Sequence, residues 1–507
     1  MSDLDGAVRA RLATLEADGI PARIWARDHT VWRPDPAEIS DRLGWLTVHE
    51  EMAGHLDEVR AFAAGCAEDG FRWAVLCGMG GSSLAPEVFR ESFGPGLLDL
   101  VVLDTTHPDQ ILALEEAIDL ERALFVVSSK SGTTIETRSQ LEHFWRRAPD
   151  GRRFVAITDP GTPLAELASD RVFRRTFENP PDIGGRYSAL SFFGLVPAAL
   201  VGADLDALLE GARRAASACG PEVPAAENPA AVLGAWMGEG ARLGRDKLTI
   251  ALHGPVASLA AWVEQLVAES TGKDGTGLIP VEGEALGPPS LYGSDRLFVA
   301  AEVGEQGSIV EWLERSGHPV VRSSLREPAE LGDAMLRWEL ATAVAGHVLG
   351  VHPFDQPDVQ AAKDATDRVL ASGGRTDVEA GDLAEVADSV GAGDYVAIQA
   401  FVPRNDETTS RLRSVRQRIR DHRRVATTVG FGPRFLHSTG QLHKGGPDSV
   451  VCLQVVDEPD ADLDVPGRPY SFGDLLAAQA AGDLEALRGR GRRAVRVSLE
   501  ELERFGW

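Results

Sequence analysis

The chain has 507 residues, and its shares of 43% hydrophobic and 25% charged residues are typical of a folded globular protein. Its 51 basic and 77 acidic side chains give a net charge of −26, which argues against binding to nucleic acids or anionic membranes. The four cysteines form no CxxC pair and are too few for a disulfide framework. Because neither a secretory signal nor a membrane-spanning run is visible, we expect a cytoplasmic protein.

Residues 1–65 are expected to form an N-terminal helical segment, because apolar residues recur there at helical spacing. After about residue 71 the pattern changes to short apolar runs, each followed by a turn and an amphipathic segment. These runs lie at 73–77, 99–104, 123–127 and 154–158. The alternation predicts βαβ units and a parallel sheet with helices on both faces, so residues 66–225 are assigned to a first α/β domain.

A weaker form of the same rhythm follows the turn-rich segment 220–229, with apolar runs near 247–252, 296–301 and 318–322. It predicts a second α/β domain over residues 226–380. Residues from about 335 to 425 look largely helical, and a strand is expected at 450–456 ahead of a charged helical end. The predicted fold class is therefore α/β, with two doubly wound domains with parallel sheets and helical N- and C-terminal segments. Residues 381–507 are expected to be a C-terminal segment that completes the active site.

Glycine and hydroxyl residues follow the first predicted strand, in the stretch Cys77-Gly-Met-Gly-Gly-Ser-Ser-Leu-Ala-Pro86. Backbone N–H groups at such a strand–helix turn point outward, and the helix dipole favours an anion there. A dinucleotide motif would need a glycine where Ser83 stands. Phosphate or sugar binding is the favoured interpretation, and a ligand-free tight turn is the alternative.

A second hydroxyl-rich turn follows the third strand, in Val127-Ser-Ser-Lys-Ser-Gly-Thr-Thr-Ile-Glu-Thr137. Thr133 and Glu136 have the spacing of a capping box, so a helix is expected to begin here. A hydroxyl-lined helix N-terminus beside Lys130 suits a phosphomonoester. The alternative is a purely structural role in which these residues only cap the helix. Two such turns at neighbouring strand ends favour a binding site, because ligands of doubly wound sheets bind at that edge.

Two further stretches contain groups suited to proton transfer. Arg186 follows two glycines, so its backbone can approach a ligand and its fixed charge can stabilise an oxyanion. Gln265 and Glu269 are four residues apart and share one face of a predicted helix, with Glu269 in its last turn. A carboxylate in that position is a candidate general base, although a solvated glutamate is the ordinary alternative.

The last candidate stretch is Leu436-His-Ser-Thr-Gly-Gln-Leu-His-Lys-Gly-Gly-Pro447. His437 and Lys444 are seven residues apart, so on one helix they would face the same way and serve a sugar hydroxyl or a ring oxygen. His437 and His443 would point apart, which argues against a metal site. No metal and no cofactor are predicted.

Taken together and in this order, these segments resemble the phosphoglucose isomerase (glucose-6-phosphate isomerase) family, which carries two sugar-isomerase α/β domains. The stretches that carry the resemblance are Gly-Met-Gly-Gly-Ser-Ser-Leu, Ser-Lys-Ser-Gly-Thr-Thr-Ile-Glu-Thr, Gly-Gly-Arg-Tyr-Ser and Glu-Ser-Thr-Gly-Lys. The resemblance runs from about residue 25 to the end. Residues 354–357 and 436–444 look closest to the branch fused behind transaldolase in some bacteria.

The resemblance implies a glycolytic and gluconeogenic enzyme that interconverts glucose 6-phosphate and fructose 6-phosphate through a cis-enediol. It implies Glu269 as the base and Arg186 as the group that stabilises the enediolate. Lys444 is implied near the ring oxygen, and His437 is a further catalytic candidate that stands where the main branch has a glutamine. The residues implied in substrate binding are Gly81, Ser82, Ser129, Lys130, Ser131, Thr134, Gly185 and Gln265. The family's site is completed across a dimer interface, so the resemblance also implies a homodimer.

One departure from the family concerns ring opening. The main branch has a histidine downstream of the base, but the comparable stretch at 293–298 has none. Lys444, His437 and His352 are the candidates for this step. Two other functions stay open, an isomerase of another phosphosugar such as mannose 6-phosphate and a non-catalytic phosphosugar sensor.

Overall fold

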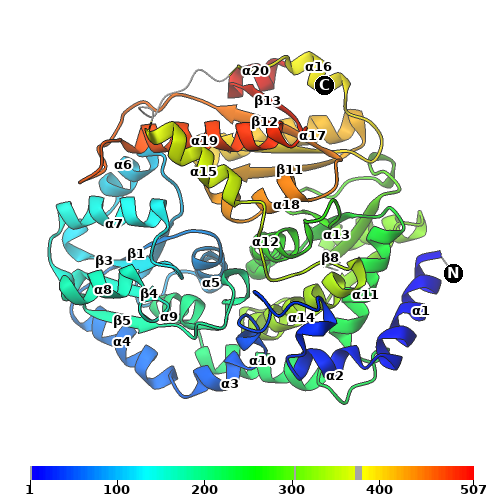
Figure 1. Cartoon of the computed structure of the whole chain (residues 1–507), viewed down its shortest axis with the longest axis horizontal. Helices are drawn as coiled ribbons and strands as arrows, with labels where there is room; N and C mark the ends of the chain where they lie inside the picture. Colours follow the sequence, from blue (N-terminus) through cyan, green and yellow to red (C-terminus); the bar gives the residue numbers. More distant parts are fainter. Residues whose placement is uncertain (1–2, 302–303, 372–378) are drawn as a thin grey trace.

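The computed structural model describes residues 3–301, 304–371 and 379–507, which form three parallel sheets wrapped by helices (Figure 1). Four helices precede the first sheet, as the N-terminal pattern predicts. They are α1 (Asp3–Ala17), α2 (Ile20–Trp25), α3 (Val48–Ala53) and α4 (Leu56–Glu68). No helix among the described residues is long and apolar enough to cross a lipid bilayer.

The first sheet has the order β2-β1-β3-β4-β5, and every pair of neighbours is parallel. Its strands are β1 (Trp73–Gly78), β2 (Asp99–Leu103), β3 (Ala123–Ser128), β4 (Phe154–Thr158) and β5 (Arg175–Glu178). Its helices are α5 (Leu84–Phe93), α6 (Pro108–Ala117), α7 (Ile135–Arg147), α8 (Pro163–Asp170) and α9 (Phe192–Leu200). The predicted α/β rhythm is confirmed here, and the central strands are buried throughout because helices cover both faces.

The strand order fixes where a ligand can bind in this sheet. The chain moves outward from β1 to β2 and then returns to β3 on the other side, so a crevice opens between the carboxyl ends of β1 and β3. Gly78 pairs with Ser128 in the register of these two strands, so both strands end at one level. The two hydroxyl-rich turns predicted from the sequence therefore lie side by side.

The second sheet has the order β7-β6-β8-β9 and is also parallel. Its strands are β6 (Lys247–Ala251), β7 (Ile279–Val281), β8 (Arg296–Ala301) and β9 (Val320–Ser323). Its helices are α10 (Leu205–Ala218), α11 (Pro229–Arg242), α12 (Leu259–Thr271), α13 (Gly304–Arg315) and α14 (Leu331–Leu349). The next helix, α15 (Gln360–Ala371), packs against α19 (Phe472–Gly489) (Figure 1). The three predicted strands are confirmed, and the short β7 is an addition.

A third parallel sheet has the order β11-β10-β12-β13. The sequence analysis predicted only one of its strands, at 450–456, which is confirmed as β12. Its strands are β10 (Tyr395–Phe401), β11 (Ala426–Phe431), β12 (Val450–Val456) and β13 (Arg493–Val497), and its helices are α16 (Leu383–Asp388), α17 (Asp406–Arg423), α18 (Gly440–Gly445), α19 (Phe472–Gly489) and α20 (Leu499–Arg504). The expectation of a largely helical 335–425 is wrong at β10, a fully buried strand between charged helices. We call residues 379–507 the C-terminal α/β unit.

The C-terminal α/β unit packs against both of the other sheets' domains (Figure 1). Arg434 forms buried ion pairs with Glu87 of α5 and, at 2.7 Å, with Asp104 after β2. An apolar cluster joins Ala268 and Val281 of the second domain to residues of β10, α18 and β12. The three sheets thus meet around a common centre.

Candidate active site

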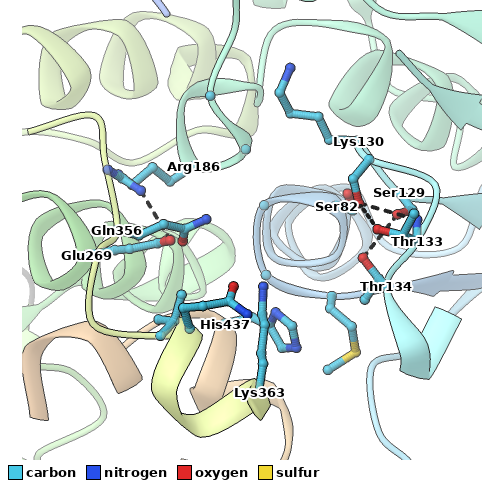
Figure 2. Close-up of a pocket in the computed structure, with 18 of the residues that line it drawn as sticks. Ser82, Ser129, Lys130, Thr133, Thr134, Arg186, Glu269, Gln356, Lys363 and His437 are labelled. Carbon is cyan, nitrogen blue, oxygen red and sulfur yellow. Dashed lines mark hydrogen bonds and ion pairs between the residues drawn. The ribbon is translucent and has the colours of Figure 1, made fainter. Parts of the chain in front are cut away.

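A cavity of about 1500 Å³ lies where the three sheets meet. Its walls come from the turns after β1 and β3, the turn η6 (Gly185–Tyr187), helix α12, the segment that precedes α15, and the C-terminal α/β unit. Figure 2 shows that hydroxyl groups gather on one side of this cavity and that Arg186 and Glu269 lie on the other. Every catalytic and substrate-binding candidate from the sequence analysis lines this cavity.

The hydroxyl side of the cavity is built by Ser82 and by the turn between β3 and α7. Ser129 Oγ lies 3.1 Å from Thr134 Oγ1 and accepts a hydrogen bond of 3.2 Å from the Gly132 N–H. Ser131 Oγ lies 2.9 Å from Thr133 Oγ1. These groups present hydroxyl donors at the first turn of α7, where the helix dipole favours an anion.

The turn after β1 lies in backbone contact with Gly185. A Cβ atom at Gly81 would collide with the Gly185 carbonyl oxygen, so only glycine permits this approach. Gly185 itself has open space where a Cβ would stand. The contact brings Arg186 and the hydroxyl side of the cavity together, which the sequence analysis did not predict.

Lys130 does not point toward the hydroxyl groups. Its ammonium forms an ion pair with Asp159 and donates a hydrogen bond of 2.9 Å to the Pro181 carbonyl. Figure 2 shows its side chain extending away from Ser129 and Thr134. Its place beside a bound phosphate therefore stays a prediction that this geometry does not favour.

The opposite side of the cavity holds Glu269 and Arg186, which form a buried ion pair of 3.1 Å between Oε1 and Nη1. Arg186 also donates to Ser270 Oγ at 2.9 Å and to the carbonyls of Pro353 and Asp355 at 2.7 and 2.8 Å. These four partners fix the guanidinium, whose position next to the carboxylate suits stabilisation of an oxyanion formed there.

Gln265 lies one helical turn before Glu269, as the spacing predicts. Its Nε2 donates to Glu269 Oε2 at 3.1 Å and to the His437 carbonyl at 2.8 Å. Gln265 therefore links the carboxylate on α12 to the C-terminal α/β unit.

His437 faces a buried carboxylate that the sequence analysis assigned to another role. Its Nε2 lies 2.8 Å from Glu136 Oε1, and Glu136 also accepts a hydrogen bond of 2.7 Å from Gln479 Nε2. Burial alone would raise the pKa of Glu136, but the adjacent His437 lowers it below its usual value. The capping role expected for Glu136 is wrong, because helix α7 begins at Ile135 without a side-chain cap and the carboxylate is turned to the histidine.

Lys444 lies apart from His437, contrary to the seven-residue argument. His437 ends the turn η10 (Arg434–His437), the helical conformation breaks at Ser438, and Lys444 lies in the separate helix α18. The Lys444 ammonium forms a fully buried ion pair with Asp483 and donates a hydrogen bond of 3.3 Å to the Gly440 carbonyl. Lys444 reaches only the wall of the cavity, so the expected pairing of these two side chains is wrong.

His352 also lines the cavity, but backbone groups occupy its ring. Nδ1 accepts a hydrogen bond of 3.1 Å from the Phe354 N–H, and Nε2 lies 3.2 Å from the Ala37 carbonyl oxygen. His352 Nδ1 also lies 3.9 Å from the Asp355 carboxylate, so of the two histidines His437 is the one with a carboxylate at hydrogen-bond distance inside the cavity.

Two cavity residues, Gln356 and Lys363, were missed by the sequence analysis. Gln356 directly follows Asp355, whose carbonyl binds Arg186, and the Lys363 side chain extends into the cavity from α15 (Figure 2). Within the described part of the chain, no side-chain hydrogen bond or ion pair engages the Lys363 ammonium. Their spacing gave no signal, because Gln356 precedes α15, which begins at Gln360, so the two residues do not share a helix face.

The described residues contain no group of three or more His, Cys, Asp and Glu side chains placed to hold a metal ion. The four cysteines are all buried and free. The chemical groups that the cavity offers are thus hydroxyls, amides, a carboxylate–guanidinium pair, a carboxylate–imidazole pair and an ammonium group.

Comparison with known proteins relates this arrangement to sugar-phosphate isomerases. A family model described as phosphoglucose isomerase matches residues 43–279. A glucose-6-phosphate isomerase of Thermus thermophilus is 30% identical over 402 residues, which cover 66% of this chain and 91% of the relative. One from Rubrobacter xylanophilus is 29% identical over 381 residues, covering 62% of this chain and 85% of the relative.

Two solved structures resemble the fold. A hypothetical protein from Thermus thermophilus superimposes with a TM-score of 0.63 at 27% identity, over 73% of this chain and 98% of the other. A glucose-6-phosphate isomerase from Chlamydia trachomatis has a TM-score of 0.54 at 20% identity, over 71% of this chain and 79% of the other, and shows likeness of fold alone.

Proposed function

Since the chain belongs to the phosphoglucose isomerase family, we propose that it interconverts glucose 6-phosphate and fructose 6-phosphate as an aldose–ketose isomerase. The observation that carries the proposal is the buried Glu269–Arg186 pair, 3.1 Å apart, in one cavity with a hydroxyl-lined helix N-terminus. A base beside a fixed cation, opposite a phosphate cradle, is the arrangement that an enediol isomerisation needs.

The substrate phosphate binds at the turn before α7. Ser82, Ser129, Ser131 and Thr134 donate hydroxyl hydrogen bonds, and the open space at Gly185, which carries no Cβ, lets the substrate approach closely. The sugar then extends across the cavity toward Glu269. The hydroxyl groups recognise the phosphate and not the stereochemistry of the sugar ring. Recognition of the ring is therefore left to the opposite wall of the cavity.

His437 opens the sugar ring. Its Nε2–H donates to the ionised Glu136 carboxylate, which leaves Nδ1 as the acceptor for the proton of the anomeric hydroxyl. The ring oxygen takes up a proton as the C–O bond breaks, and the ammonium of Lys363 is the donor available in the cavity. We assign to Lys363 the role near the ring oxygen that the resemblance gave to Lys444.

Glu269 moves the proton between the two carbons. Its carboxylate removes the proton from C2 of the open aldose, and the electron pair forms the C1–C2 double bond of a cis-enediol. Arg186 stabilises the negative charge that develops on the substrate oxygen, and Gln265 holds the other carboxylate oxygen. Transfer of the O2 proton to O1 and return of the carbon-bound proton to C1 give the ketose, with no net oxidation.

The proposal is tested by measuring fructose 6-phosphate turnover in a coupled assay for glucose 6-phosphate, with EDTA present. General-base catalysis is typically worth about 10²–10⁴-fold, so Glu269→Gln is expected to lower kcat by that factor. Glu38→Gln, which changes an exposed acid on the same cavity wall, is the matched control and should keep the wild-type rate. An active Glu269→Gln variant with unchanged kcat would overturn the assignment.

Two alternatives are separated in the same assay. Turnover of mannose 6-phosphate above that of fructose 6-phosphate would reassign the substrate. A wild type that is stabilised against heat by phosphosugars but turns over none would indicate a sensor. We also propose a cytoplasmic location and association into homodimers, to be measured by cell fractionation and light scattering.

A further inference from the structure

One part of the cavity wall carries cations that no carboxylate neutralises. It is formed by Arg138 of α7, by Lys363 and Asp367 of α15, and by Arg468 and Tyr470 of the segment before α19. We call these five residues the cationic lobe. Within residues 3–301, 304–371 and 379–507, no hydrogen bond or ion pair engages the side-chain nitrogens of its two arginines and its lysine, and Arg138 Nη1 is buried without a partner.

The remaining arginines and lysines of the cavity wall each have a carboxylate partner. They are Arg33, Arg42, Lys130, Arg186 and Lys444, paired in that order with Asp274, Asp41, Asp159, Glu269 and Asp483. The chain as a whole has a net charge of −26, so the cationic lobe is a local exception to its acidic balance. A local excess of positive charge in a cleft attracts small anions even when the net charge is negative.

The side chains of the cationic lobe lie close to one another. Burial lowers the pKa of Arg138, with Glu142 acting in the opposite direction. The charges of Arg171 and Arg468 lower this pKa further. Burial raises the pKa of Tyr470, on which the Arg468 charge also acts. Two guanidinium groups are thus held near each other, an arrangement that repels until an anion binds between them.

The carboxylates nearby do not remove this positive charge. Glu142, one helical turn after Arg138, is bound by Arg171 through both of its oxygens, at 2.8 and 3.0 Å. Glu136 is held by an imidazole and an amide, as described above. Of the acids in this part of the described chain, Asp367 is left, so three cations face one free carboxylate.

The cationic lobe adjoins the anomeric end of the proposed substrate position. Thr134 of the phosphate-binding turn and Arg138 both line the cavity and are one helical turn apart, about 6 Å along the axis of α7. Burial would raise the pKa of Glu136, but His437 and, more weakly, Lys363 lower it, so the lobe also borders the ring-opening pair. The cavity of about 1500 Å³ exceeds the size of an ordinary ligand pocket, about 300–1,000 Å³, and has room for a second charged group.

We propose that the cationic lobe is a second anion subsite, which binds the C1 phosphate of a ketohexose that carries phosphate groups at both C1 and C6. This inference rests on the proposed function for the position of the C6 phosphate at the turn before α7. The bisphosphate is not converted, because O1 must lose a proton to become the aldehyde oxygen and an esterified O1 has none. A phosphoryl transfer to O1 of the ketose would thus yield a competitive inhibitor of the isomerisation.

The test measures binding to the full-length chain by calorimetry, with fructose 1,6-bisphosphate and fructose 6-phosphate as the two probes. Wild type is expected to bind the bisphosphate about tenfold more tightly, because charge-assisted hydrogen bonds to the second phosphate are added. Arg138→Gln and Arg468→Gln should each remove most of this gain and change the Kd of fructose 6-phosphate less than twofold. In the coupled assay, the same variants should raise the inhibition constant of the bisphosphate about tenfold.

The matched control is Arg368→Gln, which removes an arginine of α15 that forms an exposed ion pair with Glu485 outside the cavity. It should bind both probes as wild type does. A wild type that binds the bisphosphate no more tightly than fructose 6-phosphate would overturn the proposal. Equal loss of affinity for both probes in Arg138→Gln and Arg468→Gln would also overturn it, because the arginines would then serve the C6 phosphate.

Inorganic phosphate, added to the chain saturated with fructose 6-phosphate, distinguishes a bridging sugar from a free anion. It is expected to bind far more weakly than the bisphosphate, because it lacks the link to a group already bound in the cavity. Equal affinity would show a site for free phosphate and would overturn the bridging ligand. Calorimetry needs no turnover, so arginine-dependent binding of the bisphosphate by a chain without isomerase activity would support the subsite and reject the proposed function.

Discussion

At the scale of single residues, the two lysines of the cavity region have different environments and therefore different roles. Lys363 is exposed and extends into the cavity, whereas Lys444 is buried against Asp483. We expect Lys363→Met to lower kcat/KM by about 10²-fold with little change in thermal stability, because a general acid is lost from a solvent-exposed position. Coupled turnover assays and thermal unfolding of the same preparation measure both quantities.

Lys444→Met is expected to give the opposite result. Removing the ammonium leaves the Asp483 carboxylate, which is 0% exposed, without its partner, and breaking a buried pair typically costs about 3–5 kcal/mol. The double variant Lys444→Met with Asp483→Leu should recover part of the lost stability. If Lys444→Met leaves the unfolding temperature unchanged but strongly lowers kcat, the catalytic role belongs to Lys444 and not to Lys363.

Lys273 gives the site a dependence on alkaline pH. Burial and the nearby Arg186 charge lower the pKa of Lys273 to about 8, even though its ammonium binds Asp355 at 2.6 Å. Loss of this proton weakens the hold on Asp355, whose carbonyl also binds Arg186. We expect kcat/KM to fall as the pH rises through about 8, and Lys273→Arg to move that fall to higher pH because arginine stays charged.

The effect of Lys273 on stability has the opposite sign. A lysine whose pKa is lowered from 10.5 to about 8 on folding binds fewer protons in the folded state between these values. Its contribution to the free energy of unfolding therefore rises with pH across that window. If kcat/KM falls with pH while this contribution to stability rises, the loss of activity comes from a local change at Arg186 and not from unfolding. If wild type and Lys273→Arg show the same dependence of kcat/KM on pH, Lys273 is not the group responsible.

At the scale of elements, the turns after β1 and β3 could be predicted because glycine and hydroxyl residues mark a strand–helix turn in any context. The relation between His437 and Lys444 could not, because their spacing implied one helix and Ser438 separates η10 from α18. β10 was not predicted from the sequence, for a different reason. Its seven buried residues lie between helices α16 and α17, whose charged residues dominate the local pattern.

The contact between α5 and η10 predicts how the C-terminal α/β unit responds to acid. Burial would raise the pKa of Glu87, but Arg434 and Arg404 lower it to about 2. Because the unfolded value is near 4.5, the stabilisation is complete above that pH and is lost as the pH falls toward 2. We expect Arg434→Gln to unfold at a lower temperature than wild type at pH 7. We also expect its unfolding temperature to fall less than that of wild type on acidification.

Thermal unfolding followed at several pH values between 7 and 3 measures this difference. Arg423→Gln, which changes an arginine of α17 in a solvent-exposed pair with Asp388, is the control and should follow the wild-type curve. An Arg434→Gln protein whose unfolding temperature falls on acidification as steeply as that of wild type would contradict the role of the Glu87 pair.

At the scale of the whole molecule, the three sheets share one strand order. In each, the second strand in sequence lies at one edge, followed by the first, third and fourth strands. The first two domains could be predicted because their strands stand out as apolar runs between turns. The third could not be placed from the sequence. Its contribution to the cavity centres on His437 and Gln479, whose role is visible only from their hydrogen bonds to Glu136.

This arrangement predicts that a ligand in the cavity stabilises all three α/β units against local opening at the same time. In the proposed binding mode, the phosphate binds the turn before α7, the sugar contacts α12, and the ring reaches His437 of the C-terminal α/β unit. Saturation with fructose 6-phosphate at about 100 times its Kd adds about 2.7 kcal/mol to the free energy of unfolding. Hydrogen exchange measured with and without ligand should slow together in peptides that cover 128–137, 265–275 and 434–445. Slowing confined to the first of these peptides would show that the phosphate binds without the sugar reaching the other walls, and it would remove His437 from the proposed ring-opening step.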